Sequence, residues 1–411
     1  MSAEAKRVLV IGAGAAGTMA AIFAARAGAR TTLLERTKDG GRKILISGGG
    51  RCNVLPSRVD EERFVTESSP NVLRRIIRSW PLADQIRFFE QDLGIPLEHE
   101  EESLKLFPAS HKARDVRDGL MACAMREGVD LVMETSVDDI APVGHGWSVT
   151  CDDGRVLEAD TVIVATGGLS VPNTGSDGRG LAVLRRLGHT IHTTYAALTP
   201  ITVEPGDFTE LAGISLPVTL TARSDGEQAK ASGGFLFTHR GYSGPSVLNV
   251  SHIAVRARAR SGTRAAISVR WTPLGDEDWA ARLRPHGART VSGAVRAELP
   301  ERLAAVLIQR ADVDPLRPLS ELRREERLRL VDVLVRGDLP WAGDEGYKKA
   351  EVTGGGVSLA EIDSRTMESR RHPGLYLCGE VLDAFGPIGG YNFLWAWATG
   401  RAAGIGAATA R

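Results

Sequence analysis

The strongest constraint on the fold of this chain is a glycine-rich turn that joins a short apolar segment to a helical one. Residues 8–11 form an aliphatic, largely β-branched run, which is typical of a strand buried on both faces of a parallel sheet. Residues 15–26 are rich in alanine and are expected to form a helix that ends near Gly28, and residues 31–35 have the character of a second strand. The segment therefore predicts a βαβ unit.

The turn inside this unit has GxGxxG spacing, and its glycines are Gly12, Gly14 and Gly17. In a dinucleotide site, Gly12 permits the tight turn, Gly14 lets a pyrophosphate approach the backbone, and Gly17 lets the helix pack on the strand. Glu35 ends the second strand, 23 positions after Gly12, where its carboxylate can accept hydrogen bonds from a ribose diol. The segment therefore predicts dinucleotide binding, and a plain glycine-rich turn is the alternative.

A second glycine-rich segment lies near the end of the chain and favours FAD over NAD as the dinucleotide. Gly379 and Glu380 follow an apolar run at residues 375–378, and residues 386–390 lead directly into a helix expected from about Tyr391. Reduced flavin can carry negative charge at N1 and C2=O, which the free amides of a helix N-terminus would stabilise. No second strand–glycine–helix unit is visible for a nicotinamide cofactor. NADH or NADPH, if either is the electron donor, is therefore expected to bind in the substrate cleft.

The segment after the βαβ unit, residues 36–53, is expected to be a loop that approaches the cofactor closely. It holds five glycines within 11 residues, and its basic residues Arg42, Lys43 and Arg51 can neutralise a pyrophosphate or a reduced flavin. A solvated basic loop is the alternative. Cys52 has two open interpretations, a buried structural thiol or a direct role in redox chemistry.

The pattern of the 411-residue chain changes twice, which indicates two domains. Strands alternate with helices up to about residue 195, and another buried parallel strand is expected over residues 161–166. From residue 196, short alternating runs separated by Gly, Pro and Asp predict a small antiparallel sheet or barrel. Amphipathic helices then follow, and they are expected at residues 245–259, 293–310 and 320–335.

The buried-strand pattern returns near the end of the chain. The sequence therefore predicts an α/β fold with one discontinuous domain, residues 1–195 and 349–411. An inserted α+β domain, residues 196–348, interrupts it.

Four long motifs carry a resemblance that covers nearly the whole chain. They are GRKILISGGGRCN at residues 41–53, LFTH at residues 236–239 with SGP at residues 243–245, EVTGGGV at residues 351–357, and residues 374–392. On these motifs the chain resembles the HI0933-like flavoproteins, of the BaiN and aminoacetone oxidase type. The resemblance implies a Rossmann-type FAD-binding domain, similar to that of glutathione reductase, with an inserted substrate-side domain.

The motifs and the resemblance together predict a cofactor site assembled from both ends of the chain. The pyrophosphate is expected near Gly14, and the pyrimidine edge of the flavin near residues 390–392. Thr166 and Gly167 are included because the chain is expected to leave the sheet there, close to FAD. The predicted FAD-binding residues are Gly12, Gly14, Ala15, Ala16, Gly17, Glu35, Arg36, Arg42, Lys43, Ser47, Gly50, Arg51, Cys52, Asn53, Val137, Thr166, Gly167, Gly379, Glu380, Gly389, Gly390, Tyr391 and Asn392.

Two residues are candidates for catalysis, His239 and Tyr391. Imidazole titrates near neutral pH, so His239 could relay a proton as hydride moves to or from a substrate. A histidine that only holds its turn by hydrogen bonds is the alternative. Tyr242 and Tyr391 are competing proton donors.

The resemblance implies an FAD-dependent oxidoreductase that transfers hydride through flavin N5 to or from a small organic substrate. Reduction of an activated C=C or C=O bond is the leading prediction. A flavin oxidase of a small amine or alcohol that uses oxygen is one alternative. A flavin-containing RNA-modifying or RNA-binding protein, or a flavoprotein without turnover, is the alternative from another class.

Composition and charge narrow the range of partners. The chain has 51 basic and 51 acidic residues, so its net charge of zero predicts no general attraction for nucleic acid or anionic membranes. Residues 256–336 hold 17 arginines, but the 11 acids among them predict a solvated, ion-paired face. The four cysteines form no CxxC pair and no metal-ligand spacing. The sequence thus predicts a cytoplasmic protein with free thiols, no bound metal, no membrane segment and no nucleic-acid partner.

Overall fold

The computed structural model describes residues 5–206 and 208–409 and divides the chain into two compact units. Unit 1 comprises Met1–Ala196 and Glu351–Arg411, and unit 2 comprises Ala197–Ala350. Each unit has its own hydrophobic core. The chain therefore leaves unit 1 once, forms unit 2, and returns to complete unit 1.

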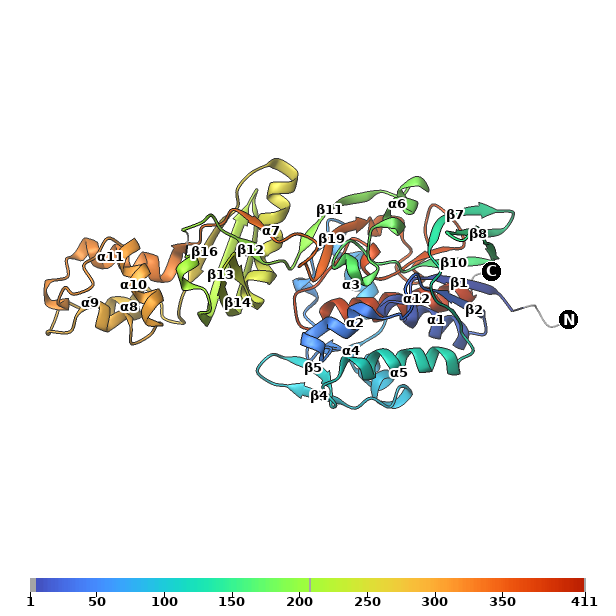
Figure 1. The fold of residues 1–411 in the computed structure, drawn as a ribbon, viewed down its shortest axis with the longest axis horizontal. Helices are drawn as coiled ribbons and strands as arrows, with labels where there is room; N and C mark the ends of the chain where they lie inside the picture. The colour runs from blue at the N-terminus through green and yellow to red at the C-terminus, as the bar shows by residue number, and fades with distance from the viewer. Residues whose placement is uncertain (1–4, 207, 410–411) are drawn as a thin grey trace. The chain divides into compact units, whose positions relative to one another are not determined.

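Unit 1 is built on a five-stranded sheet in the order β20-β10-β1-β2-β6 (Figure 1). All neighbouring strands in this sheet are parallel. The predicted α/β class and Rossmann-type fold are confirmed, and the last strand of the chain lies beside β10. The strands are β1 (Arg7–Ile11), β2 (Arg30–Leu34), β6 (Asp130–Val132), β10 (Thr161–Val164) and β20 (Leu375–Leu377).

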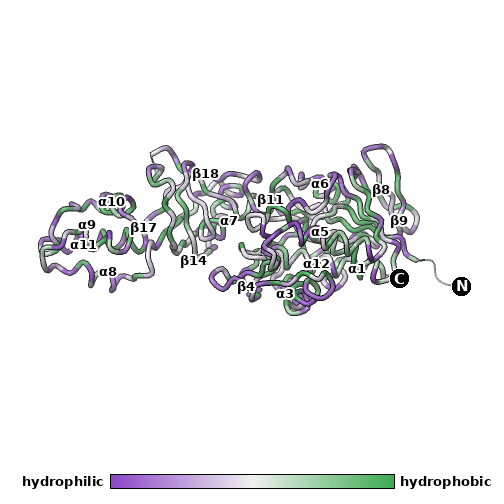
Figure 2. The backbone as a smooth tube through the Cα atoms, turned by 60° about the horizontal axis from the view of Figure 1, so that its bottom comes forward, coloured by the Kyte–Doolittle hydropathy of each residue, from purple (hydrophilic) through white to green (hydrophobic). Residues whose placement is uncertain are grey.

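Two helices of unit 1, α1 (Ala15–Arg26) and α12 (Tyr391–Thr409), pack closely against each other. Most residues of α12 are buried, and the region of unit 1 that holds α1 and α12 is mostly white to green in Figure 2. A Cβ on Gly404 would lie 2.2 Å from the carbonyl oxygen of Ala20, so only glycine allows this approach. The small residues of α1 and α12 therefore bring the N-terminal and C-terminal parts of the chain together.

The prediction of a plain loop over residues 36–53 is wrong. This segment contains α2 (Arg42–Ile46) and a 3-10 turn (Ser47–Gly50). The helix forms because Ile44 is buried in the core, and Gly41 at its N-cap has a φ of +70°, which favours glycine. The glycines of the segment thus bend the chain around a short helix that places Lys43 and Ser47.

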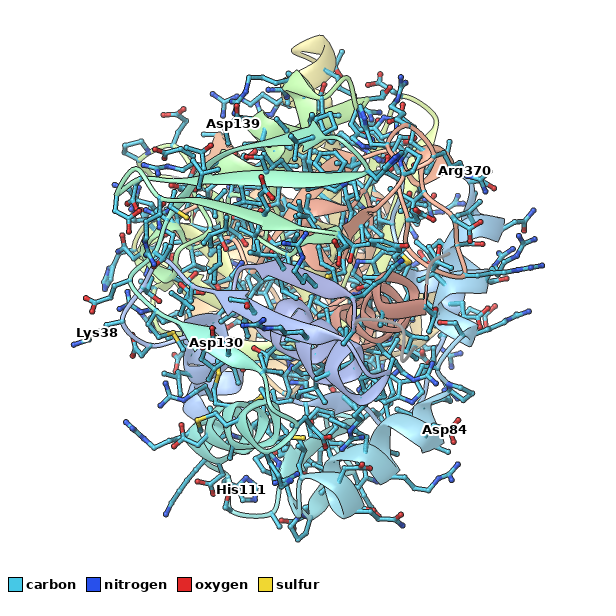
Figure 3. The ribbon with its side chains drawn as sticks, turned by 90° about the vertical axis from the view of Figure 1, so that its right-hand side faces the viewer. Lys38, Asp84, His111, Asp130, Asp139 and Arg370 are labelled. Atoms are coloured by element: carbon cyan, nitrogen blue, oxygen red, sulfur yellow. The ribbon has the colours of Figure 1, made fainter. Side chains whose placement is uncertain are left out.

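Three smaller sheets and four helices complete unit 1. The sheets have the strand orders β3-β5-β4, β7-β8-β9 and β11-β19. Charged and polar side chains such as those labelled in Figure 3 lie on the surface of this unit. The strands are β3 (Leu55–Pro56), β4 (Leu97–Glu100), β5 (Lys105–Pro108), β7 (Val137–Val143), β8 (Gly146–Cys151), β9 (Val156–Ala159), β11 (Ile191–Ala197) and β19 (Val352–Val357); the helices are α3 (Pro70–Arg78), α4 (Leu82–Arg87), α5 (Ala113–Arg126) and α6 (Arg179–Arg186).

Unit 2 contains a seven-stranded sheet in the order β17-β16-β13-β14-β15-β12-β18. Every strand pair in it is antiparallel. The order has two ends, β17 and β18, so the sheet is open and the barrel form of the prediction is not adopted. The strands are β12 (Ile201–Thr202), β13 (Ser215–Ser224), β14 (Glu227–Thr238), β15 (Gly241–Ser243), β16 (Ala266–Arg270), β17 (Gly337–Asp338) and β18 (Gly343–Asp344).

Helices cover this sheet and form the rest of unit 2. The longest of them, α7 (Pro245–Ser261), packs on β13 and β14. The single helix expected over residues 293–310 is instead two helices, because Pro300 interrupts the pattern and forms the N-cap of the second. The remaining helices are α8 (Asp276–Arg282), α9 (Val291–Val295), α10 (Glu301–Arg310) and α11 (Arg324–Arg336). Within the described ranges, no helix has the length and apolar composition needed to cross a membrane.

Candidate functional site

The three glycines of the turn after β1 have different surroundings. Gly12 has a φ of +102°, and a Cβ there would lie 2.7 Å from the carbonyl oxygen of Ala165. A Cβ on Gly17 would lie 1.8 Å from the carbonyl oxygen of Gly12. At Gly14, no other described part of the chain comes within 4 Å of that position. The fold itself therefore requires Gly12 and Gly17, whereas Gly14 leaves a space open at the start of α1.

The start of α1 offers backbone donors to a ligand in that space. Gly14 is the N-cap of α1, and no side chain caps the helix. The amides of Ala15 and Ala16 consequently have no acceptor within the helix. The N-terminus of a helix with free amides favours the binding of a negatively charged group such as a diphosphate.

Glu35, directly after β2, is fixed beside the same turn. Its Oε2 accepts a hydrogen bond from the Ala13 amide at 2.8 Å. Its Oε1 accepts hydrogen bonds from the amide and the hydroxyl of Thr37, at 2.8 and 2.7 Å. Carboxylate oxygens have more than one acceptor position, so Glu35 keeps capacity for the ribose contact that the sequence predicts.

The end of β10 adds a polar group to the same edge of the sheet, because β10 is the neighbour of β1. The Thr166 hydroxyl is buried and has no hydrogen-bond partner among the described residues. Burying a hydroxyl without a partner is unfavourable unless a ligand or water satisfies it. The open space at Gly14, the uncapped start of α1 and the Thr166 hydroxyl therefore fit the binding of FAD at this edge.

Three of the predicted basic contacts have acidic partners within the protein. Arg42 donates to Asp39 at 2.8 Å, and Arg36 forms an ion pair with Asp177. Arg51 pairs with Glu100 at 2.9 Å, and its guanidinium lies 4.2 Å from the centre of the Phe107 ring. These arginines are thus neutralised locally, and their predicted contact with FAD stays a prediction.

Lys43 belongs to a different arrangement, a network that joins four distant parts of unit 1. Its ammonium donates to Glu380 Oε2 at 2.6 Å and to the Ser170 hydroxyl at 2.8 Å. Glu380 Oε1 accepts from the Ser170 hydroxyl at 2.5 Å and from the Thr353 amide at 2.9 Å. The hydroxyl oxygen of Thr353 in turn accepts from the amides of Leu169 and Ser170, at 2.7 and 3.1 Å.

Glu380 is ionised in this network. Burial opposes its charge, but the positive charge of Lys43 and the hydrogen bonds from Lys43, Ser170 and Thr353 outweigh that effect and hold its pKa below its usual value. Ser170 and Thr353 were not among the predicted site residues. Only the motif around Thr353 pointed to that region, since Lys43 and Glu380 are 337 positions apart in the sequence.

The glycines before α12 are packed against the small sheet β3-β5-β4. Gly390 has a φ of +88°, and a Cβ there would lie 2.3 Å from the carbonyl carbon of Leu55. A Cβ on Gly389 would lie 3.6 Å from Cε of Lys105, so the Lys105 side chain runs beside the start of α12. Burial is the main influence on Lys105 and lowers the pKa of its ammonium. The sequence pattern did not single out Lys105.

Two predicted FAD-binding residues at the start of α12, Tyr391 and Asn392, use their side chains in hydrogen bonds with other residues of the protein. The Asn392 side chain accepts from the Gly386 amide at 2.9 Å and donates to the Gly386 carbonyl at 3.0 Å, so it closes the glycine-rich turn. Tyr391 is buried, and its hydroxyl donates to the Arg58 carbonyl at 3.1 Å. Both side chains thus shape the loop that would face the flavin edge.

His239 lies in unit 2, at the two-residue turn between β14 and β15. Its side chain is exposed, while the turn is held by the neighbouring Thr238, whose hydroxyl donates to the Gly241 carbonyl at 3.1 Å and accepts from the Arg240 amide at 3.2 Å. The alternative in which His239 itself secures the turn therefore receives no support from these hydrogen bonds.

Four of the predicted residues lie at the bend after α2. The Ser47 hydroxyl donates to the Ile44 carbonyl at 2.7 Å, and Gly50 has a φ of +86°. Cys52 is fully buried with a φ of +60°, and Asn53 follows it beside Gly48. Burial raises the pKa of the Cys52 thiol to about 12, against a smaller opposing effect of Ser47, so the group is a thiol at neutral pH.

The remaining predicted residues lie at strand ends of unit 1. Val137 opens β7 opposite Cys151, and Gly167 follows Thr166 with a φ of +72°. Gly379 begins the short turn after β20 with a φ of +78°, and a Cβ there would lie 2.7 Å from the Ala16 side chain. The structure thus brings Gly379, from the C-terminal part of the chain, to Ala16 at the start of α1, while Val137 lies on a separate small sheet.

Comparison with known proteins gives full-length matches. The family model described as "HI0933-like protein Rossmann domain" matches residues 6–406. A ribosomal RNA dihydrouridine synthase of Escherichia coli (strain K12) is 33% identical over 398 residues, which cover 95% of each chain. A 3-dehydro-bile acid delta(4,6)-reductase of Clostridium scindens is 31% identical over 417 residues, 98% of this chain and 99% of that protein.

A solved structure, 3-ketosteroid delta1-dehydrogenase from Sterolibacterium denitrificans, shares the fold with a TM-score of 0.55 at 13% identity, over 98% of this chain and 99% of that one. The family match confirms the resemblance that the motifs carried, together with the FAD cofactor and the oxidoreductase class. By its sequence over nearly its whole length and by its fold, the chain therefore belongs to the HI0933-like family and is an FAD-dependent oxidoreductase.

Proposed function

We propose that this protein reduces a C=C bond conjugated to a carbonyl group, and that uridine in ribosomal RNA is its substrate. The observation that supports this most is the 33% identity, over 95% of both chains, to a ribosomal RNA dihydrouridine synthase. The proposal departs from the sequence-based prediction of no nucleic-acid partner. That prediction depended on the net charge of the whole chain, which says nothing about local charge.

The names of the two relatives point to one type of bond. Dihydrouridine differs from uridine by one hydride and one proton added across the C5–C6 double bond, which is conjugated to the C4 carbonyl. A delta(4,6)-reductase of a 3-dehydro bile acid likewise acts on double bonds conjugated to a 3-oxo group. Both reactions therefore need a hydride at an electrophilic carbon conjugated to the carbonyl group, which is the β-carbon C6 in uridine, and a proton at a carbon of the resulting enolate.

Bound FAD supplies the hydride chemistry. The chain's own residues then have three tasks in this proposal. The space at Gly14 and the amides at the start of α1 bind the diphosphate. The Lys43–Glu380 ion pair ties α2 to the segment after β20 and so holds two walls of the cofactor site in place. Lys105 and the amides that open α12 place positive charge where the flavin's pyrimidine edge is expected.

The proton is assigned to His239 in this proposal. Imidazole is a common general acid in enzymes. The His239 side chain is exposed, and its ring takes no part in the two hydrogen bonds of Thr238 that hold the turn. The Tyr391 hydroxyl already donates to the Arg58 carbonyl, and the Cys52 thiol is buried. Tyr391 is therefore retained as a residue that positions the start of α12.

A small 3-oxo steroid is the second candidate substrate, favoured by the 31% identity to the bile-acid reductase. The same bond type is involved, so the two candidates differ in what surrounds the reacting carbon atoms. NADH or NADPH is the proposed electron donor, and it is expected to compete with the substrate. An oxidase of a small amine or alcohol is the alternative reaction in the opposite direction.

A single-turnover experiment separates these candidates. The FAD-loaded protein is reduced without oxygen by NADH or NADPH and mixed with protein-free ribosomal RNA that lacks dihydrouridine, or with a 3-oxo-delta(4,6) steroid. We expect flavin reoxidation by the RNA, together with a nucleoside that has gained two hydrogen atoms in mass spectrometry. Reoxidation by the steroid alone would favour the second candidate, and reoxidation by oxygen alone, with hydrogen peroxide formed, would overturn both.

A further inference from the structure

A surface depression of about 1310 Å³ lies on unit 1, apart from the glycine turn and the Lys43 network. Its walls are the segment before α3, the outer face of α3, residues 364–366 and the second half of α12. We call it the arginine depression because six arginines line it: Arg58, Arg74, Arg75, Arg78, Arg365 and Arg401.

The sequence of α3 explains why so many arginines point into the depression. Leu73, Ile76 and Ile77 are buried on the inner side of this helix, which packs against α12. Arg74 and Arg78, one turn apart, and Arg75 lie on the opposite side. Burial of the apolar side thus presents a basic face to solvent.

The positive charge of the depression is only partly compensated. Its three acids are Asp60, Glu61 and Glu62. Glu61 pairs with Arg78 at 2.8 Å, and Glu62 lies 3.9 Å from Arg74. Six arginines minus three acids leave a local charge of +3, although the whole chain is neutral.

The excess belongs to arginines without an acidic partner among the described residues; Arg401 is one of them, and its guanidinium lies over the rings of Phe23 and Trp80. Within the described ranges, no ion pair or side-chain hydrogen bond involves the guanidinium groups of Arg58, Arg75 and Arg365, and all three side chains are exposed. Elsewhere on unit 1, arginines such as Arg36 and Arg42 pair with a nearby carboxylate. The arginine depression therefore gathers several arginines without an acidic partner, in the part of the chain that the structure describes, at one place on unit 1.

One end of the depression reaches the predicted flavin edge. The Arg58 carbonyl accepts the hydrogen bond from Tyr391, the first residue of α12. From there the depression extends to the second half of α12, where its lining residues run from Arg401 to Thr409. An anionic chain bound at the Arg58 end of the depression would thus lie close to Tyr391, at the start of α12.

We propose that the arginine depression binds the phosphodiester backbone of the RNA that carries the uridine substrate. This inference rests on the proposed function. Guanidinium groups bind phosphate in a bidentate manner, and contacts of this kind position a nucleic acid without reading its sequence. Arg58, Arg75 and Arg365 line one depression, so their positive potentials add there, and salt screens the attraction over a Debye length of about 8 Å at physiological ionic strength.

The test measures binding of a fluorescein-labelled 20-nucleotide oligouridylate to the FAD-loaded, full-length protein by anisotropy. The variant is Arg75→Glu with Arg365→Glu. We expect its Kd to rise at least tenfold over wild type in low salt. A plot of log K against log salt concentration has a negative slope, and in the variant this slope should become shallower by about 1.4. That is roughly 0.7 for each lost phosphate contact with single-stranded nucleic acid.

A matched control has the same charge change outside the depression, Arg30→Glu with Arg114→Glu. Both arginines are exposed on unit 1, and within the described part of the chain neither side chain has a hydrogen bond or an ion pair. The control is expected to keep the wild-type salt slope. FAD content and thermal midpoint show whether each double variant is folded.

Each other outcome overturns the inference. Equal losses in the depression variant and the control would mean that only overall charge matters. An unchanged Kd in the depression variant would show that the RNA does not bind in the arginine depression. Binding of wild type to phosphatidylglycerol vesicles but not to the RNA would assign the depression to an anionic membrane surface.

The proposed function is tested separately, by reduction of uridine in wild-type turnover with ribosomal RNA. Equal turnover of wild type and the depression variant at low RNA concentration would support the proposed uridine reduction and contradict RNA binding in the arginine depression. RNA that binds in the arginine depression but whose uridine is never reduced would support the binding surface and contradict the proposed function.

Discussion

At the scale of single residues, glycine positions separate what the fold needs from what the cofactor needs. Gly12 and Gly17 touch the backbone closely, whereas Gly14 faces open space. The same motif therefore contains two structural positions and one that is explained by a ligand. A substitution at each kind of position should have a different consequence.

We expect Gly14→Val to give a folded protein that has lost FAD. A Cβ at Gly14 has no other described atom within 4 Å, and the N-cap has a φ of −77° that valine can adopt. The valine side chain would instead fill the space expected to hold the diphosphate. The FAD Kd, measured by fluorescence titration, should rise at least tenfold, equivalent to ~1.4 kcal/mol. As the contrasting variant, Gly17→Val should lower the thermal midpoint of the apoprotein, since its Cβ overlaps the Gly12 carbonyl. Full FAD binding by Gly14→Val would show that the diphosphate lies elsewhere.

Lys105 is the residue through which charge near the flavin edge can be tested. Replacing it with Met removes a partly buried ammonium beside Gly389 and retains most of the side-chain volume. We expect the flavin's two-electron midpoint potential to fall by about 30 mV, the equivalent of ~1.4 kcal/mol. The matched control is Lys112→Met, at an exposed position before α5. Equal potentials in both variants would place Lys105 outside the field of the flavin.

At the scale of elements, unit 1 is held together by contacts between segments that are far apart in the sequence. Glu361, in the 3-10 turn after β19, accepts hydrogen bonds from the amide and the hydroxyl of Thr190, at 3.1 and 2.7 Å, just before β11. It also pairs with Arg371 and lies 2.8 Å from His189. One carboxylate thus connects three segments around the β11-β19 sheet.

This carboxylate should make stability depend on acid pH. Burial opposes its ionisation, but hydrogen bonds from Arg371, Thr190 and His189 prevail and lower its pKa to about 2. The stabilisation is therefore complete above the unfolded pKa of about 4.3 and is lost as pH falls through about 2. Glu361→Gln should reduce the free energy of unfolding by roughly 1–3 kcal/mol at pH 7. In urea titrations, the gap to wild type should shrink between pH 4.5 and pH 2. A gap that is constant over this range would exclude ionisation as the cause.

At the scale of the whole molecule, the candidate residues are distributed over both units. The cofactor-binding features described above belong to unit 1, whereas His239 belongs to unit 2. The two kinds of function, holding the cofactor and supplying a proton, can therefore be separated by mutation.

We expect His239→Ala to keep FAD content and flavin spectrum, because the residue lies outside unit 1. Turnover of RNA uridine should fall by roughly 10²–10⁴, the loss typical of a missing general acid. His286→Ala, another exposed histidine of unit 2, is the control and should be unaffected. A fully active His239→Ala variant would show that another group donates the proton.

Much of the fold and part of the site could be predicted from local sequence. The strand–turn–helix around Gly12 depends on contacts within a few tens of residues, and its spacing shows directly in the sequence. The short helix α2 was missed because its glycine-rich flanks outweigh the helical signal of only five residues. The division of residues 293–310 into two helices was missed because Pro300 was included in a longer amphipathic pattern.

Sequence by itself determined the βαβ unit, the second glycine-rich segment and the FAD family, since each is written in a continuous stretch of residues. Tertiary structure decided the partners of the charged groups. Lys43 meets Glu380 across 337 positions, and Lys105 lies beside Gly389, because β10, β20 and α12 bring the two ends of the chain together. The uncompensated charge of the arginine depression likewise became visible only where α3 and α12 pack, because ion pairing depends on distances in space that no local pattern encodes.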